Sequence, residues 1–156
     1  MSVLCSTAQV GSRTMPCDPP EEDRPVHTPV MVRQVMEVSA PSAGDRVVDL
    51  TVGTAGHALR LAAEIGRDGL LVGLDADEAA LKLARERLDD EAPCTFRLFR
   101  CWFSRVGDVV ERLDVDGFDV ALADLGVGTH QLDDPGRGLS FDSEQRLDMR
   151  FDPEQE

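Results

Sequence analysis

Two aspartates follow directly after apolar segments that have the composition of buried strands. Asp75 comes after residues 69–74, and Asp124 comes after residues 118–123. In an open α/β sheet, ligands bind outside the carboxyl ends of the strands, so both carboxylates are placed where a ligand is expected. A carboxylate at such a position can accept hydrogen bonds from the hydroxyls of a ribose or from an exocyclic amine. The sequence therefore predicts a ligand site at one edge of a sheet.

A glycine-containing loop lies upstream of Asp75. It follows the apolar segment at residues 46–50 and contains Gly53 and Gly56. Glycines let a backbone turn tightly and approach a ligand, and the amides at the start of a helix face outward. Such a loop is as often a plain connection, so both interpretations stay open for the loop alone. His57 precedes Asp75 by eighteen positions, a spacing that favours a nucleotide site with Asp75 on the ribose.

Other side chains near these strand ends have a structural and a functional interpretation. Asp77 is interpreted as the N-cap of the next helix. Trp102 and Phe103 follow the third predicted strand, where an aromatic ring can cover an adenine or pack against the sheet, and the sequence favours neither. Histidines in loops and at helix starts are more often structural than catalytic. This applies to His27, His57 and His130.

Strand and helix patterns alternate along most of the chain. Strands are predicted at residues 46–50, 69–74, 94–99 and 118–123, and helices at 30–38, 56–65, after Asp77, and at 103–113. This alternation predicts an α/β fold with a parallel, doubly wound sheet. Residues 1–25 mix Ser, Thr, Pro and acidic residues without a hydrophobic period, and we expect a flexible tail there. Residues 26–156 are expected to belong to one domain.

The charge and the cysteines restrict the classes of function. The 156 residues carry a net charge of −14, which by itself argues against binding a polyanion. The four cysteines form no CxxC pair and have no histidine at zinc spacing, so no metal site and no disulfide framework is predicted. No segment has the roughly 20 apolar residues of a membrane span. We expect a cytoplasmic protein without a membrane partner.

Four motifs, taken in order, resemble a single protein family. The motifs are His27-Thr-Pro-Val30, Asp49-x-Thr51-x-Gly53-x-x-Gly56-His57, Leu74-Asp75-x-Asp77, and a long segment from Asp124 through Gln131 and Arg137 to Phe141 with Leu147-Asp-Met-Arg150. Together they resemble the bacterial 16S rRNA cytosine-N4 methyltransferases, the MraW or RsmH family, over roughly residues 27–153. The last motif is long enough to be highly specific.

This resemblance implies a partial class I, Rossmann-like methyltransferase fold that uses S-adenosylmethionine and needs no metal. About four parallel strands with flanking helices are expected, and the later strands and the inserted helical domain of the family are expected to be missing. The domain would then be the N-terminal part of a methyltransferase domain. The cofactor contacts implied by matching position are Ala55, Gly56, His57, Asp75, Phe103, Asp124 and Gln131. Asp124 would also align the substrate amine with the methyl group.

The activity implied by the resemblance is N4-methylation of a cytosine in small-subunit ribosomal RNA, which would be the partner. The acidic charge motivates an alternative, a cofactor-binding half-domain without catalytic activity that acts as a regulator, a split-enzyme piece or a degenerate paralogue. A fourth strand without a fifth beside it would expose an apolar edge, which predicts self-association or a partner chain there.

Ala55 stands where the family has glycine. We expect its methyl group to project toward the cofactor and to cost on the order of 1 kcal/mol if the backbone has a positive φ.

Overall fold

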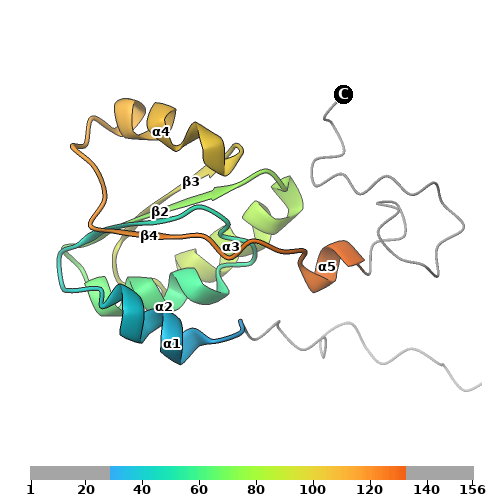
Figure 1. The fold of residues 1–156 in the computed structure, drawn as a ribbon, viewed down its shortest axis with the longest axis horizontal. Helices are drawn as coiled ribbons and strands as arrows, with labels where there is room; N and C mark the ends of the chain where they lie inside the picture. Colours follow the sequence, from blue (N-terminus) through green and yellow to red (C-terminus); the bar gives the residue numbers. More distant parts are fainter. Residues whose placement is uncertain (1–28, 133–156) are drawn as a thin grey trace, which may run out of the picture.

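A parallel sheet of four strands forms the centre of the protein (Figure 1). The computed structural model describes residues 29–132. The strands are β1 (Arg46–Asp49), β2 (Leu70–Asp75), β3 (Thr95–Arg100) and β4 (Val120–Leu122), in the order β3-β2-β1-β4. Every neighbouring pair is parallel. The predicted α/β class and the number of strands are confirmed.

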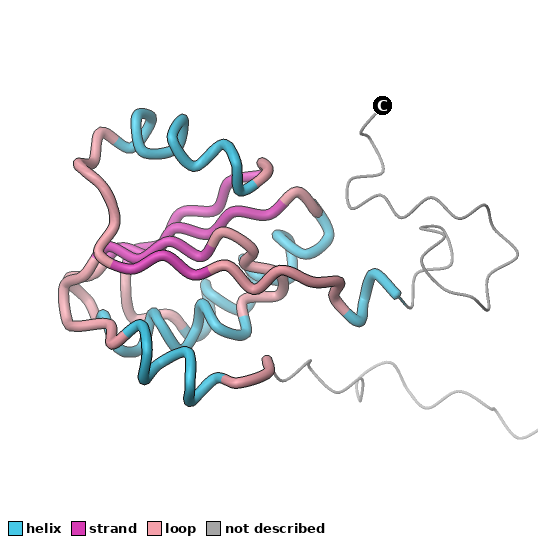
Figure 2. Tube along the Cα trace, viewed as in Figure 1, coloured by secondary structure: helices cyan, strands magenta, loops and turns pink. Residues whose placement is uncertain are grey.

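The strand order changes direction at β1. The chain runs outward from β1 through β2 to β3 and then returns to place β4 on the other side of β1. Val48 of β1 lies between Val72 of β2 and Ala121 of β4. A crevice at such a switch point, outside the carboxyl ends of the strands, is where open α/β sheets bind ligands. Figure 2 shows the loops that leave these strand ends gathered at one end of the sheet.

Helices cover both faces of the sheet. The elements are α1 (Val32–Ser39), α2 (Gly56–Ile65), α3 (Glu78–Glu91), a short 3-10 turn at Phe103–Arg105, α4 (Val106–Leu113) and α5 (Thr129–Leu132). In Figure 1, α1 and α2 lie below the sheet and α4 lies above it. Within residues 29–132, no helix has the length and apolar character that a membrane span requires.

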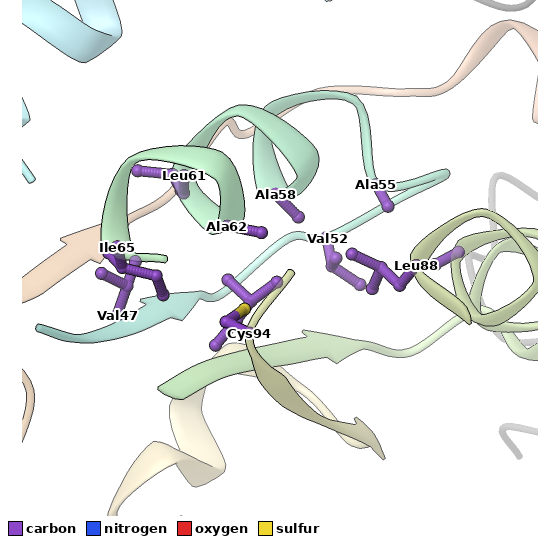
Figure 3. Packing of buried hydrophobic residues seen from close by; sticks show 11 residues of the cluster. Val47, Val52, Ala55, Ala58, Leu61, Ala62, Ile65, Leu88 and Cys94 are labelled. Carbon is purple, nitrogen blue, oxygen red and sulfur yellow. The ribbon is translucent and has the colours of Figure 1, made fainter. Parts of the chain in front are cut away.

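The larger core lies between the sheet and α2, with α3 beside it (Figure 3). Val47 points to this side and Val48 to the side of α4, because successive side chains of a strand point to opposite faces. Both are buried. Besides Val47, the largest fully buried side chains of this core are Leu61, Ile65, Leu71 and Leu88. This packing holds β1 and β2 firmly, so the loops at their carboxyl ends start from fixed positions.

The boundaries depart from the predicted ones where the backbone is unusual. The first helix begins at Val32 and not at residue 30, because Met31 has a left-handed conformation with φ 58°. The segment predicted as one helix at 103–113 divides into the 3-10 turn and α4. The fourth strand is shorter than predicted, although Asp119 still bonds to Arg46 through its backbone N–H (2.8 Å) and its carboxylate (2.8 Å).

Several predictions fall outside the described residues. They concern the tail at residues 1–25, His27, and the motif residues from Asp133 to Arg150. Within residues 29–132, β4 ends the sheet on its side, and Ala121 is exposed there. The predicted association at this edge stays a prediction.

Candidate functional site

A cleft of about 700 Å³ opens at the switch point of the sheet. Its walls are the glycine loop (residues 50–56), the ends of β1 and β2, the aromatic pair after β3, and residues 124–128 after β4. Ligand sites in proteins commonly have volumes of about 300–1,000 Å³. All but one of the predicted cofactor contacts line this cleft. Those that do are Gly56, His57, Asp75, Phe103, Asp124 and Gln131.

Ala55 is the exception. Its backbone is left-handed, with φ 65°, which is the conformation expected at a position where the family has glycine. Its side chain, however, is fully buried in the core beneath α2 (Figure 3). The expectation that its methyl group projects toward the cofactor is therefore wrong. The backbone of Ala55 is also used within the protein: its N–H donates to the Val52 carbonyl (2.8 Å) and its carbonyl accepts from Leu59 (3.0 Å).

Two opposing effects determine what Ala55→Gly does. Glycine removes the cost of the left-handed backbone, about 1 kcal/mol, but it also removes a buried methyl group worth about 0.8 kcal/mol and adds backbone entropy to the unfolded chain. We expect the free energy of unfolding to change by less than about 1 kcal/mol. Urea denaturation measures it. A change much larger than about 1 kcal/mol would contradict this balance of opposing effects.

The two glycines of the loop are needed for different reasons. Gly53 has φ 51°, a left-handed conformation that favours glycine. Gly56 begins α2, and a Cβ there would lie 2.9 Å from Cγ of Pro29. Such a contact is too close without movement of the Pro29 segment. Gly56 therefore lets the chain before α1 approach the loop, and Pro29 itself lines the cleft.

Hydrogen bonds from β2 and α3 hold the glycine loop from two sides. The carboxylate of Asp75 accepts from the N–H of Gly53 (2.8 Å) and from that of Asp77 (2.9 Å). On the other side, Nη1 of Arg87 donates to the carbonyl of Thr54 (2.6 Å). Asp75 thus fixes the loop and also faces the cleft, which couples the two segments that the sequence predicted to form one site.

Arg87 does not line the cleft. Removing its hydrogen bond to Thr54 is therefore expected to loosen the loop without removing a group that contacts the ligand. Hydrogen bonds from a charged group contribute about 1.5–3 kcal/mol, and part of that loss should appear in ligand binding. For S-adenosylmethionine, the cofactor that the resemblance in sequence implies, we expect Arg87→Met to weaken binding by about five- to twenty-fold, as measured by calorimetry. Arg85→Met, on an exposed position of the same helix, is the matched control. Equal affinity of the two variants would show that the bond is irrelevant to the site.

The structure brings His57 and Asp124 together. Nε2 of His57 lies 3.5 Å from Oδ2 of Asp124, and the Asp124 N–H donates to Oγ1 of Thr51 (2.8 Å). His57 is buried, and its Nδ1 has no hydrogen-bond partner within the part of the chain that the structure describes. The Asp124 side chain is 57% exposed. Asp124 therefore presents a carboxylate at the open side of the cleft while its backbone is fixed.

Gln131 connects the segment after β4 to α3. Its Nε2 donates to Oδ2 of Asp77 (2.9 Å), and its Oε1 accepts from the N–H of Gly128 (2.9 Å). Asp77 is buried and accepts from the N–H of Ala79 (2.9 Å), so its predicted role as an N-cap is confirmed. Sequence reasoning missed the pair of Asp77 and Gln131, because 54 positions separate them. The only indication in the sequence was that a buried N-cap aspartate uses one carboxylate oxygen for the cap and needs a hydrogen-bond donor for the other.

Asp49 is a second residue whose role was not predicted. It ends β1, is 2% exposed and lines the cleft. Its pKa is raised to about 7, chiefly by burial; the hydrogen bond from the Thr51 N–H (3.1 Å) opposes this rise, and the nearby charges of Asp75 and Asp124 add to it. A charged residue at the end of an apolar strand was the signal in the sequence. No group of three or more side chains suited to a metal comes together in residues 29–132.

The aromatic pair lies at the mouth of the cleft. Both Trp102 and Phe103 line it, and Phe103 is 43% exposed. Because Phe103 is not packed away against the sheet, its ring is available to a flat ligand group.

Comparison with known proteins places these features in a family. A family model described as the MraW methylase family matches residues 24–156. Proteins named ribosomal RNA small subunit methyltransferase H are similar in sequence. The one from Geobacter sulfurreducens is 46% identical over 125 residues, which are 80% of this chain and 40% of the relative. The one from Mycoplasma mobile is 35% identical over 130 residues, 83% of this chain and 42% of the relative.

The chain thus spans about 40% of the length of these relatives. Among solved structures, the fold is similar to a SAM-dependent O-methyltransferase from Thermotoga maritima, with a TM-score of 0.51 and 20% identity over 64% of this chain and 36% of that one. It is also similar to TrmN from Thermus thermophilus, with a TM-score of 0.51 and 24% identity over 64% of this chain and 29% of that one. At these identities the likeness concerns the fold alone.

Proposed function

Because this chain belongs to the MraW methylase family, we propose that its cleft binds S-adenosylmethionine and that the protein takes part in N4-methylation of a cytosine in small-subunit ribosomal RNA. The observation that carries the proposal is the arrangement of Asp75. Its carboxylate holds the glycine loop and faces a cleft at the switch point of the sheet. That is where a nucleoside ligand of an α/β sheet is held by its ribose.

The residues of the cleft fit this cofactor in charge and in shape. Asp75 would hold the ribose hydroxyls, and Phe103 would lie beside the adenine. Gly56 and His57, at the start of α2, would lie beside the methionine part, and the buried Nδ1 of His57 has no hydrogen-bond partner among residues 29–132. Gln131 would close the cleft through its bond to Asp77. When bound, S-adenosylmethionine supplies an activated methyl group, and its positive charges suit a cleft with several carboxylates.

Asp124 is the residue that we assign to the substrate. Its exposed carboxylate can accept a hydrogen bond from the amino group of a cytosine and orient the lone pair of that nitrogen. Thr51 fixes its backbone, and His57 lies beside its carboxylate. Alignment by a fixed acceptor is the main contribution that a protein makes to such a transfer, because the reactive group already belongs to the cofactor.

A second candidate is binding of the cofactor without methyl transfer. It is favoured by the net charge of −14 and by the absence of Lys and Arg among the described residues that line the cleft. Affinity for RNA comes mostly from such cations. In the first candidate, the positive charge that binds RNA would come from residues outside the cleft lining, and residues 26–156 would form the N-terminal part of a methyltransferase domain.

One experiment separates the two candidates. The purified chain is first titrated with S-adenosylmethionine in a calorimeter and then incubated with small ribosomal subunits and cofactor labelled in the methyl group. Label on a cytosine N4 supports the methyltransferase, and binding without label supports the second candidate. The absence of binding would contradict both. Asp124→Asn is expected to reduce label about 100-fold, whereas Asp90→Asn, an exposed change on α3, should not.

A further inference from the structure

Asp49 is the most deeply placed carboxylate of the cleft. It is 2% exposed, yet it belongs to the cleft lining, at the carboxyl end of the central strand β1. The N–H of Thr51 donates to its Oδ1. One backbone hydrogen bond is little compensation for a buried negative charge, which is costly without a partner. A ligand that enters the cleft can supply what is missing if the ligand is cationic.

The groups that face Asp49 from neighbouring elements offer no such partner. Asp75 comes from the end of β2 and Asp124 from the segment after β4, and both are acidic. From α2, His57 also lines the cleft, with its Nε2 directed at Asp124. Within the described lining there is no Lys or Arg. The electrostatic field in the cleft therefore favours positive charge.

We propose that Asp49 is the counter-ion of the cationic part of the cofactor, its ammonium or its sulfonium, and that Asp49 releases a proton to solvent when this part enters the cleft. The inference rests on the proposed binding of S-adenosylmethionine and deepens it. No covalent bond changes within the cofactor: the carboxylic acid loses its proton to the buffer, and the carboxylate and the cation remain as an ion pair.

The protonation state of Asp49 in the protein without a ligand supports this. Burial raises the pKa of Asp49 to about 7, so near neutral pH about half of the molecules hold the proton. A cation close to a carboxyl group favours its ionised form and lowers its pKa. Binding and proton release are thereby linked.

The linkage has a defined direction. Below pH 7 the cation must first displace a proton from Asp49, so the affinity falls as the pH falls. Near pH 8 Asp49 is already ionised, and its own titration no longer changes the affinity. For a single group with a pKa near 7, S-adenosylmethionine is expected to bind about ten-fold more weakly at pH 6 than at pH 8.

Calorimetry in buffers of different ionisation enthalpy measures the released protons directly. The intact chain is titrated at pH 7 with S-adenosylmethionine, S-adenosylhomocysteine, which keeps the ammonium but lacks the sulfonium, and 5′-methylthioadenosine, which lacks both. We expect the release of about half a proton with S-adenosylmethionine and none with 5′-methylthioadenosine. Release with S-adenosylhomocysteine as well identifies the ammonium as the partner of Asp49, and its absence identifies the sulfonium.

Other results would overturn the inference. They are equal release with 5′-methylthioadenosine, or binding of S-adenosylmethionine without release. If none of the three ligands binds, the proposed function fails and the inference with it, an outcome that differs from binding without protons.

A variant tests whether the proton comes from Asp49. Asp49→Asn has nearly the same shape and cannot ionise, so S-adenosylmethionine binding should release no proton and should lose its dependence on pH. At pH 8 the affinity should fall at least ten-fold. Asp90→Asn removes the same charge from an exposed position of α3 and should behave like the parent. Undiminished release in Asp49→Asn would assign the proton elsewhere and refute the inference. The parent titrations do not depend on the folding of the variant.

Discussion

Asp75→Asn is expected to weaken the binding of S-adenosylmethionine by about 100- to 1,000-fold, which corresponds to about 3–4 kcal/mol. The carboxylate of Asp75 accepts from Gly53 and Asp77, and Asp75 lines the cleft where the ribose is proposed to lie. Asparagine has only one acceptor oxygen, and an NH₂ group takes the place of the other. This NH₂ group would point at a donor that the carboxylate accepts from, either a backbone N–H or a ribose hydroxyl. Both the loop and the ribose contact should therefore suffer, since hydrogen bonds to charged groups contribute about 1.5–3 kcal/mol each.

The fluorescence of Trp102 offers a direct measurement of this loss. It is the only tryptophan of the chain and lines the cleft, so ligand binding should change its emission. The same titration with Asp90→Asn controls for the removal of one negative charge. An affinity of Asp75→Asn within three-fold of the parent would show that Asp75 serves the loop alone and would remove the main support for the proposed ribose contact.

The second large effect concerns stability in the absence of any ligand. The pKa of Asp49 rises from its ordinary value of 3.8 to about 7 in the folded protein, chiefly because the carboxyl group is buried. The folded state therefore binds the proton more tightly than the unfolded state. In the window between these two values the folded chain holds a proton that the unfolded chain has lost, so the contribution of Asp49 to stability falls as the pH rises.

Asp49→Asn removes this dependence, because asparagine stays neutral at every pH. The free energy of unfolding of the parent, relative to the variant, should fall by on the order of 2–3 kcal/mol between pH 5 and pH 8. Urea denaturation followed by Trp102 fluorescence gives both values, provided that the transition is two-state. A difference between parent and variant that is the same at both pH values would contradict the raised pKa. Asp90→Asn should show no such pH-dependent difference.

Local patterns in the sequence were enough to predict most of the elements. The predicted helix at residues 56–65 agrees with α2, and the N-cap at Asp77 agrees with the start of α3. Apolar periodicity and capping are decided within one or two turns of chain, which explains this success. The position of Asp75 after an apolar strand and after the glycine loop was also visible in the sequence. Its carboxylate indeed reaches Gly53.

Features that depend on the direction of a single side chain were decided by the fold. Ala55 has the left-handed backbone that its place in a glycine position implies, but its methyl group packs into the core and not into the cleft. At position 56 a glycine is required because Pro29 lies against it and leaves no room for a Cβ atom. The sequence shows that a small residue is present, whereas only the packed neighbours show which contact requires it.

By itself, the sequence determined the elements, the parallel α/β class and the family of this protein, because each depends on local periodicity or on a run of adjacent motif residues. Only the tertiary structure decided which polar groups share the cleft. Asp124 meets Thr51 across 73 positions, and Gln131 meets Asp77 across 54. Burial of Asp49 likewise arises from strands and loops packed on every side. Such contacts depend on strand order and packing, which are sums of many weak interactions over the whole domain, and no local pattern encodes them.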